Sequence, residues 1–386
     1  MRQAMPAIVL ASTLLVACPL QAAQAPATSA SDAAARADAA RAAGRTSEAI
    51  AIYREALASD PKWTEGWWAL GRLLYDTDAF ADAAAAFEQC TALEPGVGTA
   101  WVMLGLAEYR LDRDDAALAH IQRGRRLGIR ADPQFRRVML YHEGILLLGK
   151  SEFEQAQEVL ARLSSEGVDN PDLTIALGMS VLRLQPPEVP ESSALRAVVA
   201  RAGVAEQLAA QKKYDEALGA YERLARDYPL VRNVQYALGR YFVARQQPDQ
   251  AVAAYEREIA RFRDHVPARL GIATAKAETD PAMALRYAEE AVALNPSVPL
   301  GHYLLGTLLL NTSDVSRAIA ELELARDAVP EDPGVHYALG RAYARAGRAA
   351  DAARAREEFK RLDEERQAAA RRDLPVATSG AEQPPR

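Results

Sequence analysis

One segment of the chain matches the written pattern of a phosphate-binding loop, G-x-x-x-x-G-K-[ST], at residues 144–151. In such a loop, backbone N–H groups cradle phosphate oxygens between a buried strand and a following helix, and the lysine adds positive charge. Here the residues between Gly144 and Gly149 are Ile-Leu-Leu-Leu, which are apolar at helical positions. We therefore expect Gly144 to pack inside a helix, Lys150 and Ser151 to lie at a turn, and no nucleotide to bind.

Other residue types that carry catalysis or bind metal ions are scattered along the chain. No two histidines have the H-E-x-x-H spacing, none lies beside cysteines at metal-ligand spacing, and there is no G-x-S-x-G elbow. The histidines are His120, His142, His265, His302 and His336. The sequence therefore predicts that the protein is not an enzyme and that it holds no cofactor and no metal ion.

A second candidate for chemistry is a run of six arginines in which Asp132 is the single acid. Its members are Arg123, Arg125, Arg126, Arg130, Arg136 and Arg137. Such a patch could bind an anionic lipid or polysaccharide, whereas the alternative is a solvated turn with no partner. The whole chain carries a formal net charge of −6, which gives no overall attraction to nucleic acid. We expect no nucleic-acid partner.

These side chains must be positioned by an array of helices, because one motif returns after 34 residues. The set Trp67, Leu70, Gly71, Ala83 and Phe87 reappears as Trp101, Leu104, Gly105, Ala117 and Ile121. In each unit the first three positions form a stripe on one helix, and the last two form a stripe on a second helix. Neither short helix can bury its stripe alone, so neighbouring units must stack.

This pattern resembles the tetratricopeptide repeat, whose Trp, Leu-Gly, Tyr, Ala, Phe, Ala and Pro positions are matched at their expected spacing. Later units in the same register centre on Leu238-Gly239, Leu305-Gly306 and Leu339-Gly340. The resemblance implies an all-α fold, a right-handed superhelical solenoid of about 8 to 9 helix-turn-helix units. Cys90 falls on the apolar stripe of a second helix, so we expect it in the core.

The resemblance also implies which residues face a partner, because in this family two positions of each first helix line the concave groove. The first position is occupied by Trp68, Val102, Tyr141, Tyr236, Tyr303 and Tyr337. The second, one turn later, is occupied by Arg72, Leu106, Ile145, Arg240, Thr307 and Arg341. Aromatic and arginine side chains suit contact with an extended or acidic peptide. The alternative is that the aromatics pack between helices and the arginines only solubilise the face.

Together these features predict a non-enzymatic scaffold or adaptor of the bacterial cell envelope that binds a protein or extended peptide. The alternative is an accessory that handles glycans or lipids beside an envelope enzyme or export machine, using the arginine run. A lysine and asparagine clamp for a terminal carboxylate occurs in some relatives, but Trp68, Arg72, Val102 and Leu106 do not reproduce it. The sequence leaves the partner's identity and the oligomeric state open.

The expectation of export comes from residues 1–25, which read as a signal peptide. Arg2 precedes an apolar run that is too short to cross a bilayer. Two processing sites compete, because Ala23-Gln24-Ala25 suits cleavage by a signal peptidase, whereas Leu15 to Cys18 resembles a lipoprotein box that ends the signal at residue 17. Pro19 departs from the usual residue after a lipidated cysteine. Membrane attachment is therefore expected only through a lipid on Cys18.

Composition shifts divide the rest of the chain. Residues 26–31 read as a flexible tether and residues 32–184 as an N-terminal array. A proline-rich interruption at 185–191 precedes a C-terminal array and capping helix at 192–372, and a disordered tail follows at 373–386. The interruption predicts either two lobes or a local insertion in one continuous superhelix.

Overall fold

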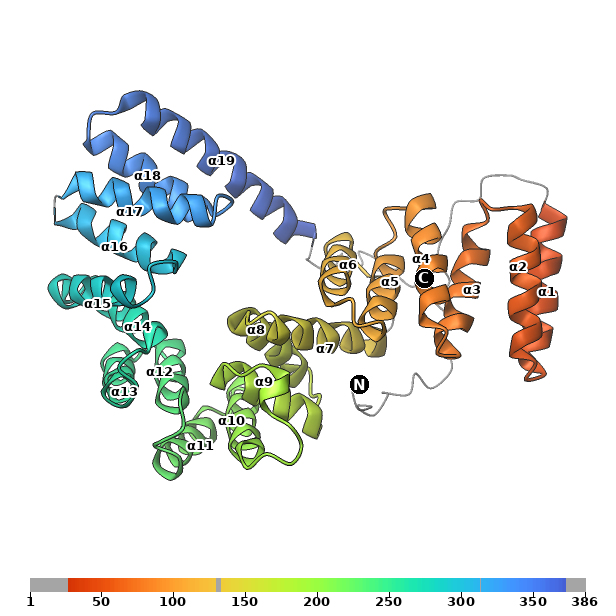
Figure 1. The fold of residues 1–386 in the computed structure, drawn as a ribbon, viewed down its shortest axis with the longest axis horizontal. Coiled ribbons are helices and arrows are strands. Elements are labelled where there is room, and N and C mark those ends of the chain that lie inside the picture. The colour runs from red at the N-terminus through yellow and green to blue at the C-terminus, as the bar shows by residue number, and fades with distance from the viewer. Residues whose placement is uncertain (1–26, 130–132, 313, 373–386) are drawn as a thin grey trace, which may run out of the picture. The chain divides into compact units, whose positions relative to one another are not determined.

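The computed structural model describes residues 27–129, 133–312 and 314–372, and within these ranges it contains helices and no strands (Figure 1). The first eight helices are α1 (Ala27–Ala42), α2 (Thr46–Ser59), α3 (Thr64–Asp76), α4 (Phe80–Leu93), α5 (Gly98–Arg110), α6 (Asp114–Leu127), α7 (Pro133–Gly149) and α8 (Phe153–Ser165). The next are α9 (Pro171–Leu182), the 3₁₀-helix η1 (Pro186–Glu188), α10 (Leu195–Ala210), α11 (Tyr214–Asp227), α12 (Val234–Ala244) and α13 (Pro248–Arg261). The last are α14 (Val266–Lys276), α15 (Pro281–Leu294), α16 (Pro299–Asn311), α17 (Val315–Ala328), α18 (Pro333–Arg345) and α19 (Ala349–Arg372).

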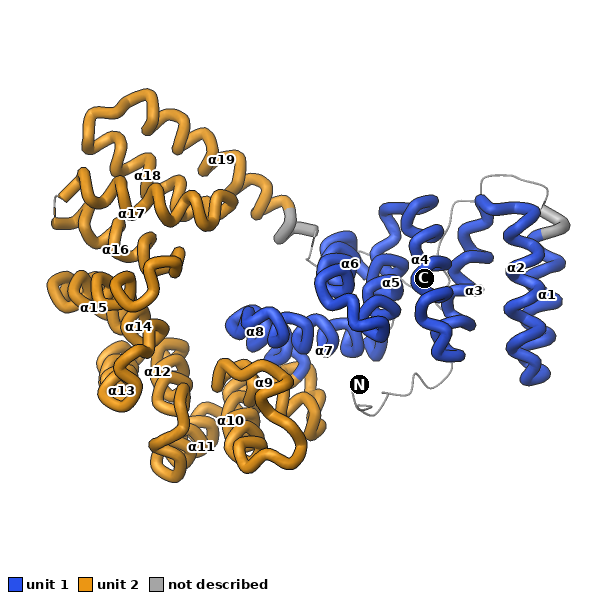
Figure 2. Tube along the Cα trace, viewed as in Figure 1, with its two compact units in different colours: residues 1–163, 371–386 blue, residues 164–370 orange. Residues whose placement is uncertain are grey.

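The chain divides into two compact units (Figure 2). Among the described residues before α19, unit 1 extends to Leu163, and unit 2 comprises the described residues of Ser164–Ala370. The division therefore precedes α9 rather than falling at the predicted interruption, residues 185–191. The reason is that α9 and α10, on either side of that run, pack against each other and belong to the same unit.

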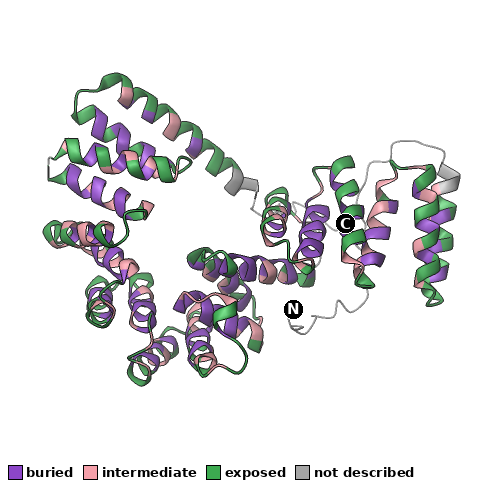
Figure 3. Cartoon of the chain, in the orientation of Figure 1, coloured by how far each residue is buried: buried purple, intermediate pink, exposed green. Residues whose placement is uncertain are grey.

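Most helices form the pairs that the repeat predicts, with each first helix packed on the second helix that follows it. In unit 1, Gly71 of α3 lets the Phe87 ring of α4 approach so closely that a Cβ would lie 2.8 Å from it. In unit 2, Gly306 of α16 receives Leu322 of α17 in the same way, at 2.6 Å. Phe87, Leu322 and Cys90 are buried, and buried positions line the facing sides of the helices (Figure 3). The predicted stripes, including Cys90 in the core, are confirmed.

The turn between the two helices of a pair has a recurrent conformation. One residue of the turn has a positive φ, in the left-handed region. In order along the chain, these residues are Gly44, Asp78, Asp112, Ser151, Lys212, Gln246 and Gly347. The next residue donates its backbone N–H to a carbonyl five positions earlier, as Ala79 does to Leu74 and Gln247 does to Phe242. These bonds satisfy carbonyl groups that the end of a helix would leave without a partner.

A ring N–H at the start of the first helix ties it to the loop that follows the preceding second helix. In unit 1 the indole Nε1 atoms of Trp67 and Trp101 donate to the carbonyls of Pro61 and Pro95, both at 2.9 Å. In unit 2 the Nε2 atoms of His302 and His336 lie 2.7 Å from the carbonyls of Pro296 and Pro330. The same six-residue bridge is therefore built from indole in one unit and imidazole in the other.

The exception to the pairing is α9, which precedes the proline-rich run and packs on α10 without a second helix of its own. A Cβ on Gly178 would lie 1.9 Å from the backbone oxygen of Val199, and one on Gly203 would lie 1.8 Å from that of Thr174. Two glycines therefore let the backbones of α9 and α10 nearly touch. The hydroxyl of Thr174 also donates to the side-chain oxygen of Gln207 at 2.9 Å.

A buried polar network joins α12 to its neighbours in unit 2. The Glu258 carboxylate of α13 accepts backbone N–H groups at the start of α12, including that of Asn233 at 2.6 Å. Asn233 donates through Nδ2 to the Leu182 carbonyl at 2.7 Å, and its Oδ1 lies 2.8 Å from Nε2 of His265. His265 in turn accepts the N–H of Ala268 at Nδ1 and so caps α14. These contacts link four helices.

The ends of the array agree with the predictions in part. The predicted capping helix corresponds to α19. It buries Ala352 and Leu362, and on its charged side Arg361 pairs with Glu358 and Glu365. The predicted tether at 26–31 is helical from Ala27, because α1 begins there. The predicted signal segment 1–25, with Cys18, and the predicted tail 373–386 lie outside the described residues. Among the residues described, no helix is both long and apolar enough to cross a membrane.

Candidate functional site

The predicted groove residues fall into two classes of exposure. Trp68, Tyr141 and Tyr303 are half-buried, and Tyr337 is 52% exposed. Val102, Leu106 and Ile145, at equivalent positions, are buried. The first-helix faces therefore offer aromatic surface at separate places, chiefly at α3 in unit 1 and at α16 and α18 in unit 2.

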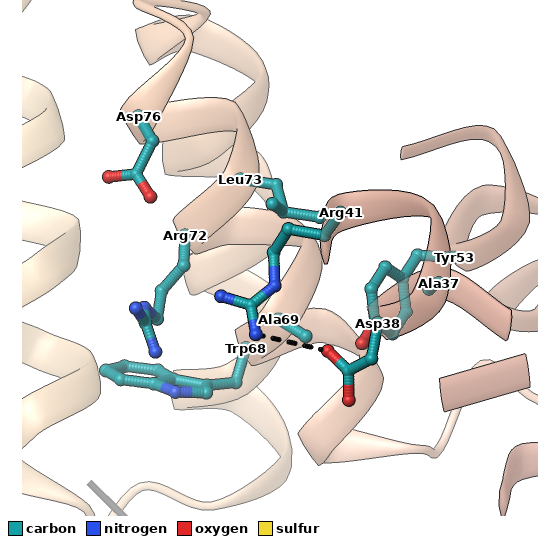
Figure 4. A pocket seen from close by; sticks show the side chains of 9 residues that line it. All are labelled: Ala37, Asp38, Arg41, Tyr53, Trp68, Ala69, Arg72, Leu73 and Asp76. Carbon is teal, nitrogen blue, oxygen red and sulfur yellow. Dashed lines mark hydrogen bonds and ion pairs between the residues drawn. The ribbon is translucent and has the colours of Figure 1, made fainter. Parts of the chain in front are cut away.

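In unit 1 the predicted pair Trp68 and Arg72 lines a small hollow of about 110 Å³ between α1, α2 and α3 (Figure 4). Its lining residues are Ala37, Asp38, Arg41, Tyr53, Trp68, Ala69, Arg72, Leu73 and Asp76. The Trp68 ring packs edge-on against Phe87 with centroids 5.5 Å apart, which fixes the indole as one wall. The opposite wall carries Asp38 and Arg41 of α1.

The charges of this hollow balance one another. Arg41 pairs with Asp38 at 3.5 Å, and both side chains are mostly in water. Burial raises the pKa of Asp76, while the positive charges of Arg72 and Arg41 act in the opposite direction. Burial, followed by the negative charge of Asp38, raises the pKa of the Tyr53 hydroxyl, which therefore stays protonated. Two guanidinium groups thus share the hollow with two carboxyl groups.

Sequence reasoning missed the wall that α1 contributes. The register contains the signal, since Asp38 lies 34 residues before Arg72 and so occupies the second groove position of its own first helix. No Trp or Leu-Gly motif marks α1, so the repeat pattern does not reveal this helix as a first helix.

In unit 2, α16 and α18 contact each other and place Tyr303, Tyr337 and Arg341 on one face, here named the α16–α18 face. The Arg341 guanidinium carbon lies 6.0 Å from the Tyr337 ring centroid, and that ring packs against Phe359 of α19 at 5.4 Å. Burial and then the negative charge of Asp332 raise the pKa of Tyr303, and Arg341 opposes this shift. Leu300, one turn before Tyr303, is 50% exposed and extends the face with apolar surface.

The structure does not bring Tyr236 to this kind of surface. Its side chain is only 7% exposed, because the ring is held between Tyr255 at 5.5 Å and His265 at 5.2 Å. Arg183 lies 6.0 Å from the same ring. Arg240, one turn later, is half-buried. The predicted pair Tyr236 and Arg240 therefore belongs to the packing of α12 with α13 and α14.

Tyr141 of α7 has no arginine one turn later, because the second groove position of this helix is occupied by Ile145, which is buried. Its ring contacts the neighbouring His142 edge-on at 5.7 Å. Burial lowers the pKa of His142, whose Nδ1 donates to the Val138 carbonyl at 2.8 Å, so this imidazole is neutral.

The predicted arginine patch is partly occupied by contacts within unit 1. The Arg123 guanidinium lies 3.8 Å from the Trp101 ring centroid, and Arg125 pairs at 3.2 Å with the fully buried Glu143. Arg137 is half-buried, whereas Arg126 and Arg136 are exposed, and Arg130 lies outside the described residues. The run is therefore not a uniform cationic surface.

The phosphate-loop match lacks the geometry of a phosphate cradle. Residues 144–149 continue α7 to its end, and Ser151 occupies the left-handed position of the following turn. Lys150 pairs with Asp115 of α6. In the described part of the chain, no group of three or more His, Cys, Asp or Glu side chains is arranged to hold a metal ion.

Comparison with known proteins gives the family. The tetratricopeptide repeat model matches residues 34–92, 69–134, 205–266, 236–278, 274–333 and 303–365, which together exceed half of the chain. No curated protein sequence matches this chain.

Solved structures with similar folds include MamA and YrrB. One MamA crystal structure is 18% identical with a TM-score of 0.39, covering 42% of this chain and 96% of that chain. MamA from Desulfovibrio magneticus RS-1 is 22% identical with a TM-score of 0.38, covering 44% of this chain and 96% of that one. YrrB, described as a TPR protein with an unusual peptide-binding site, is 17% identical with a TM-score of 0.38, covering 45% and 90%.

Proposed function

Because the chain belongs to the tetratricopeptide repeat family, we propose that it is a non-enzymatic scaffold of the bacterial cell envelope. It holds a protein partner, or an extended segment of one, on the faces of its first helices. The observation that carries this proposal is the pairing of an accessible aromatic ring with an arginine one turn later, at Trp68 and Arg72 in unit 1 and at Tyr337 and Arg341 in unit 2.

The chemistry of these pairs suits recognition better than catalysis. Aromatic rings and arginine are enriched among the residues that dominate binding energy, because they bury large areas and form directed hydrogen bonds. A ring that is 52% exposed, such as Tyr337, still has much apolar surface to remove from water when a partner binds. Repeat arrays supply extended surfaces for this purpose.

The envelope part of the proposal rests on the sequence of residues 1–25, with its charged start, apolar core and two competing processing sites. Intact-mass measurement of the mature protein distinguishes the two routes. Loss of residues 1–17 with an added lipid mass on Cys18 identifies a lipoprotein, and cleavage after Ala25 identifies a free periplasmic protein. An uncleaved chain in the cytoplasmic fraction would contradict export.

The binding role is tested by pull-down from an envelope extract, using the parent chain and Tyr337→Ala. The matched control is Leu324→Ala, because Leu324 is also 52% exposed but lies on α17, a second helix. We expect a partner to be recovered with the parent and the control and lost with Tyr337→Ala. For unit 1, the pull-down compares Trp68→Ala with its control, Leu93→Ala of α4, and we expect the partner to be lost only with Trp68→Ala. Equal recovery with all variants would contradict binding through the first-helix faces.

The alternative role, glycan or lipid handling through the arginine patch, would have to rely on the exposed Arg126 and Arg136. Retention of the parent on an anionic polysaccharide column, with loss on changing both residues to glutamine, would favour it. Arg123 and Arg125 already have aromatic and carboxylate partners, so we give the peptide-binding role precedence.

A further inference from the structure

The α16–α18 face has an imbalance of hydrogen-bonding groups. Arg341 is exposed and forms no ion pair within the described residues, and its guanidinium can only donate. The hydroxyls of Tyr303 and Tyr337 likewise form no hydrogen bond within that part of the chain. Thr307, which borders them, already donates to the Leu304 carbonyl at 2.9 Å. The face thus offers donors that a bound partner can satisfy.

Several acids of α17, of α19 and of the residue that precedes α18 already have partners. Asp332 accepts the Gly334 N–H at 2.7 Å and caps α18. Glu321 and Glu323 of α17 bond to His302 and Tyr343, each at 2.7 Å. Glu358 of α19 pairs with Arg361. None of these four carboxylates forms an ion pair with Arg341, and this leaves its charge for an incoming group.

Resting on the proposed function, we infer that the α16–α18 face selects an acidic peptide segment. A carboxylate of that segment lies against Arg341 and accepts a hydrogen bond from the hydroxyl of Tyr337 or Tyr303. A neighbouring apolar side chain of the segment covers Leu300. Charge-assisted hydrogen bonds from a guanidinium to a carboxylate are stronger than neutral ones, which favours an acidic residue over its amide. The half-exposed Leu300 and Tyr337 supply the apolar contact that such a segment needs.

The selection belongs to this face and not to every first helix of the chain. In the hollow of α1 to α3, Arg41 already pairs with Asp38, and the charges of Arg72 and Arg41 act on Asp76. An incoming carboxylate there meets two resident carboxyl groups. On the α16–α18 face, Asp332 acts on Tyr303 but already accepts the Gly334 N–H, and it forms no ion pair with Arg341. The acid preference therefore follows Arg341.

The test uses the full chain on an array of random twelve-residue peptides, each printed twice. One copy carries Asp and Glu and the other carries Asn and Gln at the same positions, so the two copies have nearly the same size and differ in carboxylate against amide. The variants are Arg341→Gln, Tyr337→Ala and a charge control, Arg261→Gln, because Arg261 is an exposed arginine of α13 in the same unit. Circular dichroism confirms that each variant is folded.

We expect the parent and Arg261→Gln to bind the acidic copies about tenfold more tightly than the amide copies, and Arg341→Gln to lose that preference. Equal binding of both copies by the parent, or an unchanged preference in Arg341→Gln, would overturn the acidic assignment. The scaffold role would survive that result if Tyr337→Ala still abolished binding. If the parent bound no peptide of the array, the peptide-binding function itself would fail.

Discussion

The hollow of α1 to α3 and the α16–α18 face use the same positions of the repeat but differ in charge balance. In the hollow, Arg41 and Arg72 lie with Asp38 and Asp76. On the face, Arg341 stands beside two tyrosines and forms no ion pair within the described residues. The comparison teaches that the register fixes where a side chain lies, whereas the neighbouring helices decide whether its charge is available.

The two units also differ in the ring that bonds a first helix to the proline carbonyl of the loop before it. Unit 1 uses the indoles of Trp67 and Trp101, and unit 2 uses the imidazoles of His302 and His336. Unit 2 further contains the buried network of Asn233, Glu258 and His265. We therefore expect unit 2 to respond to acid at α12 to α14, where burial lowers the pKa of His265.

The substitution that we expect to change the stability of one unit relative to the other most is Gly203→Ala. Its Cβ would lie 1.8 Å from the backbone oxygen of Thr174, so α9 and α10 must separate, and we expect a loss of about 3 kcal/mol of stability in unit 2. Hydrogen exchange should show reduced protection in α9 and α10, with α3 to α5 unchanged. Gly219→Ala is the control, because there the Cβ meets only the end of the Arg223 side chain at 3.3 Å. Unchanged protection of α9 and α10 would contradict the close crossing.

The next effect concerns pH. Burial lowers the pKa of His265 from 6.5 to about 4, so the unfolded chain binds more protons than the folded chain between these values. The stability that the neutral ring contributes is complete above pH 6.5 and is lost as the pH falls towards 4. By pH 5 the loss amounts to about 2 kcal/mol.

His265→Asn tests this expectation because its side-chain oxygen can still accept the Ala268 N–H but does not titrate. Protection of α12 to α14 should fall less in the variant than in the parent between pH 7 and pH 5. Glu258, whose pKa burial raises, contributes with the opposite sign, but it is present in both proteins, as is His142. Equal pH dependence in both proteins would remove the assignment to His265.

A smaller effect compares the two kinds of bridge. Trp101→Phe and His336→Phe each remove a ring N–H from a proline carbonyl, and the parent rings are 9% and 8% exposed. We expect each change to cost about 1 kcal/mol, measured by denaturant unfolding and assigned to its unit by hydrogen exchange. A clear loss in only one of them would show that the indole and imidazole bridges are not equivalent.

The smallest effect lies in the turns that both units share. Asp78 in unit 1 and Gln246 in unit 2 have φ of 60° and 56°, which glycine adopts at lower cost. Asp78→Gly and Gln246→Gly should each raise stability by about 0.5 kcal/mol, and Gly347→Ala, at φ 74°, should lower it by about 1 kcal/mol. Thermal unfolding measures all three. Destabilisation by both glycine variants would show that side-chain contacts outweigh the backbone term.

Much of the fold follows from residues that act locally. Gly71 with Phe87 and Gly306 with Leu322 can be recognised from the 34-residue period, and the apolar run after Gly144 correctly indicated a helix. The site was less predictable. Tyr236 occupies a groove position of the register but is buried by Tyr255 and His265, which come from two other helices.

The sequence by itself determined that this protein is an array of helix pairs, because each stripe and each turn depends on residues within one repeat length. The resemblance to the tetratricopeptide repeat also implied which positions could face a partner. Only the tertiary structure decided which of them do, since exposure and charge pairing depend on side chains from neighbouring helices. Tyr337 stays half in water and Arg341 keeps its charge unpaired within the described residues, while Arg41 meets Asp38, for that reason.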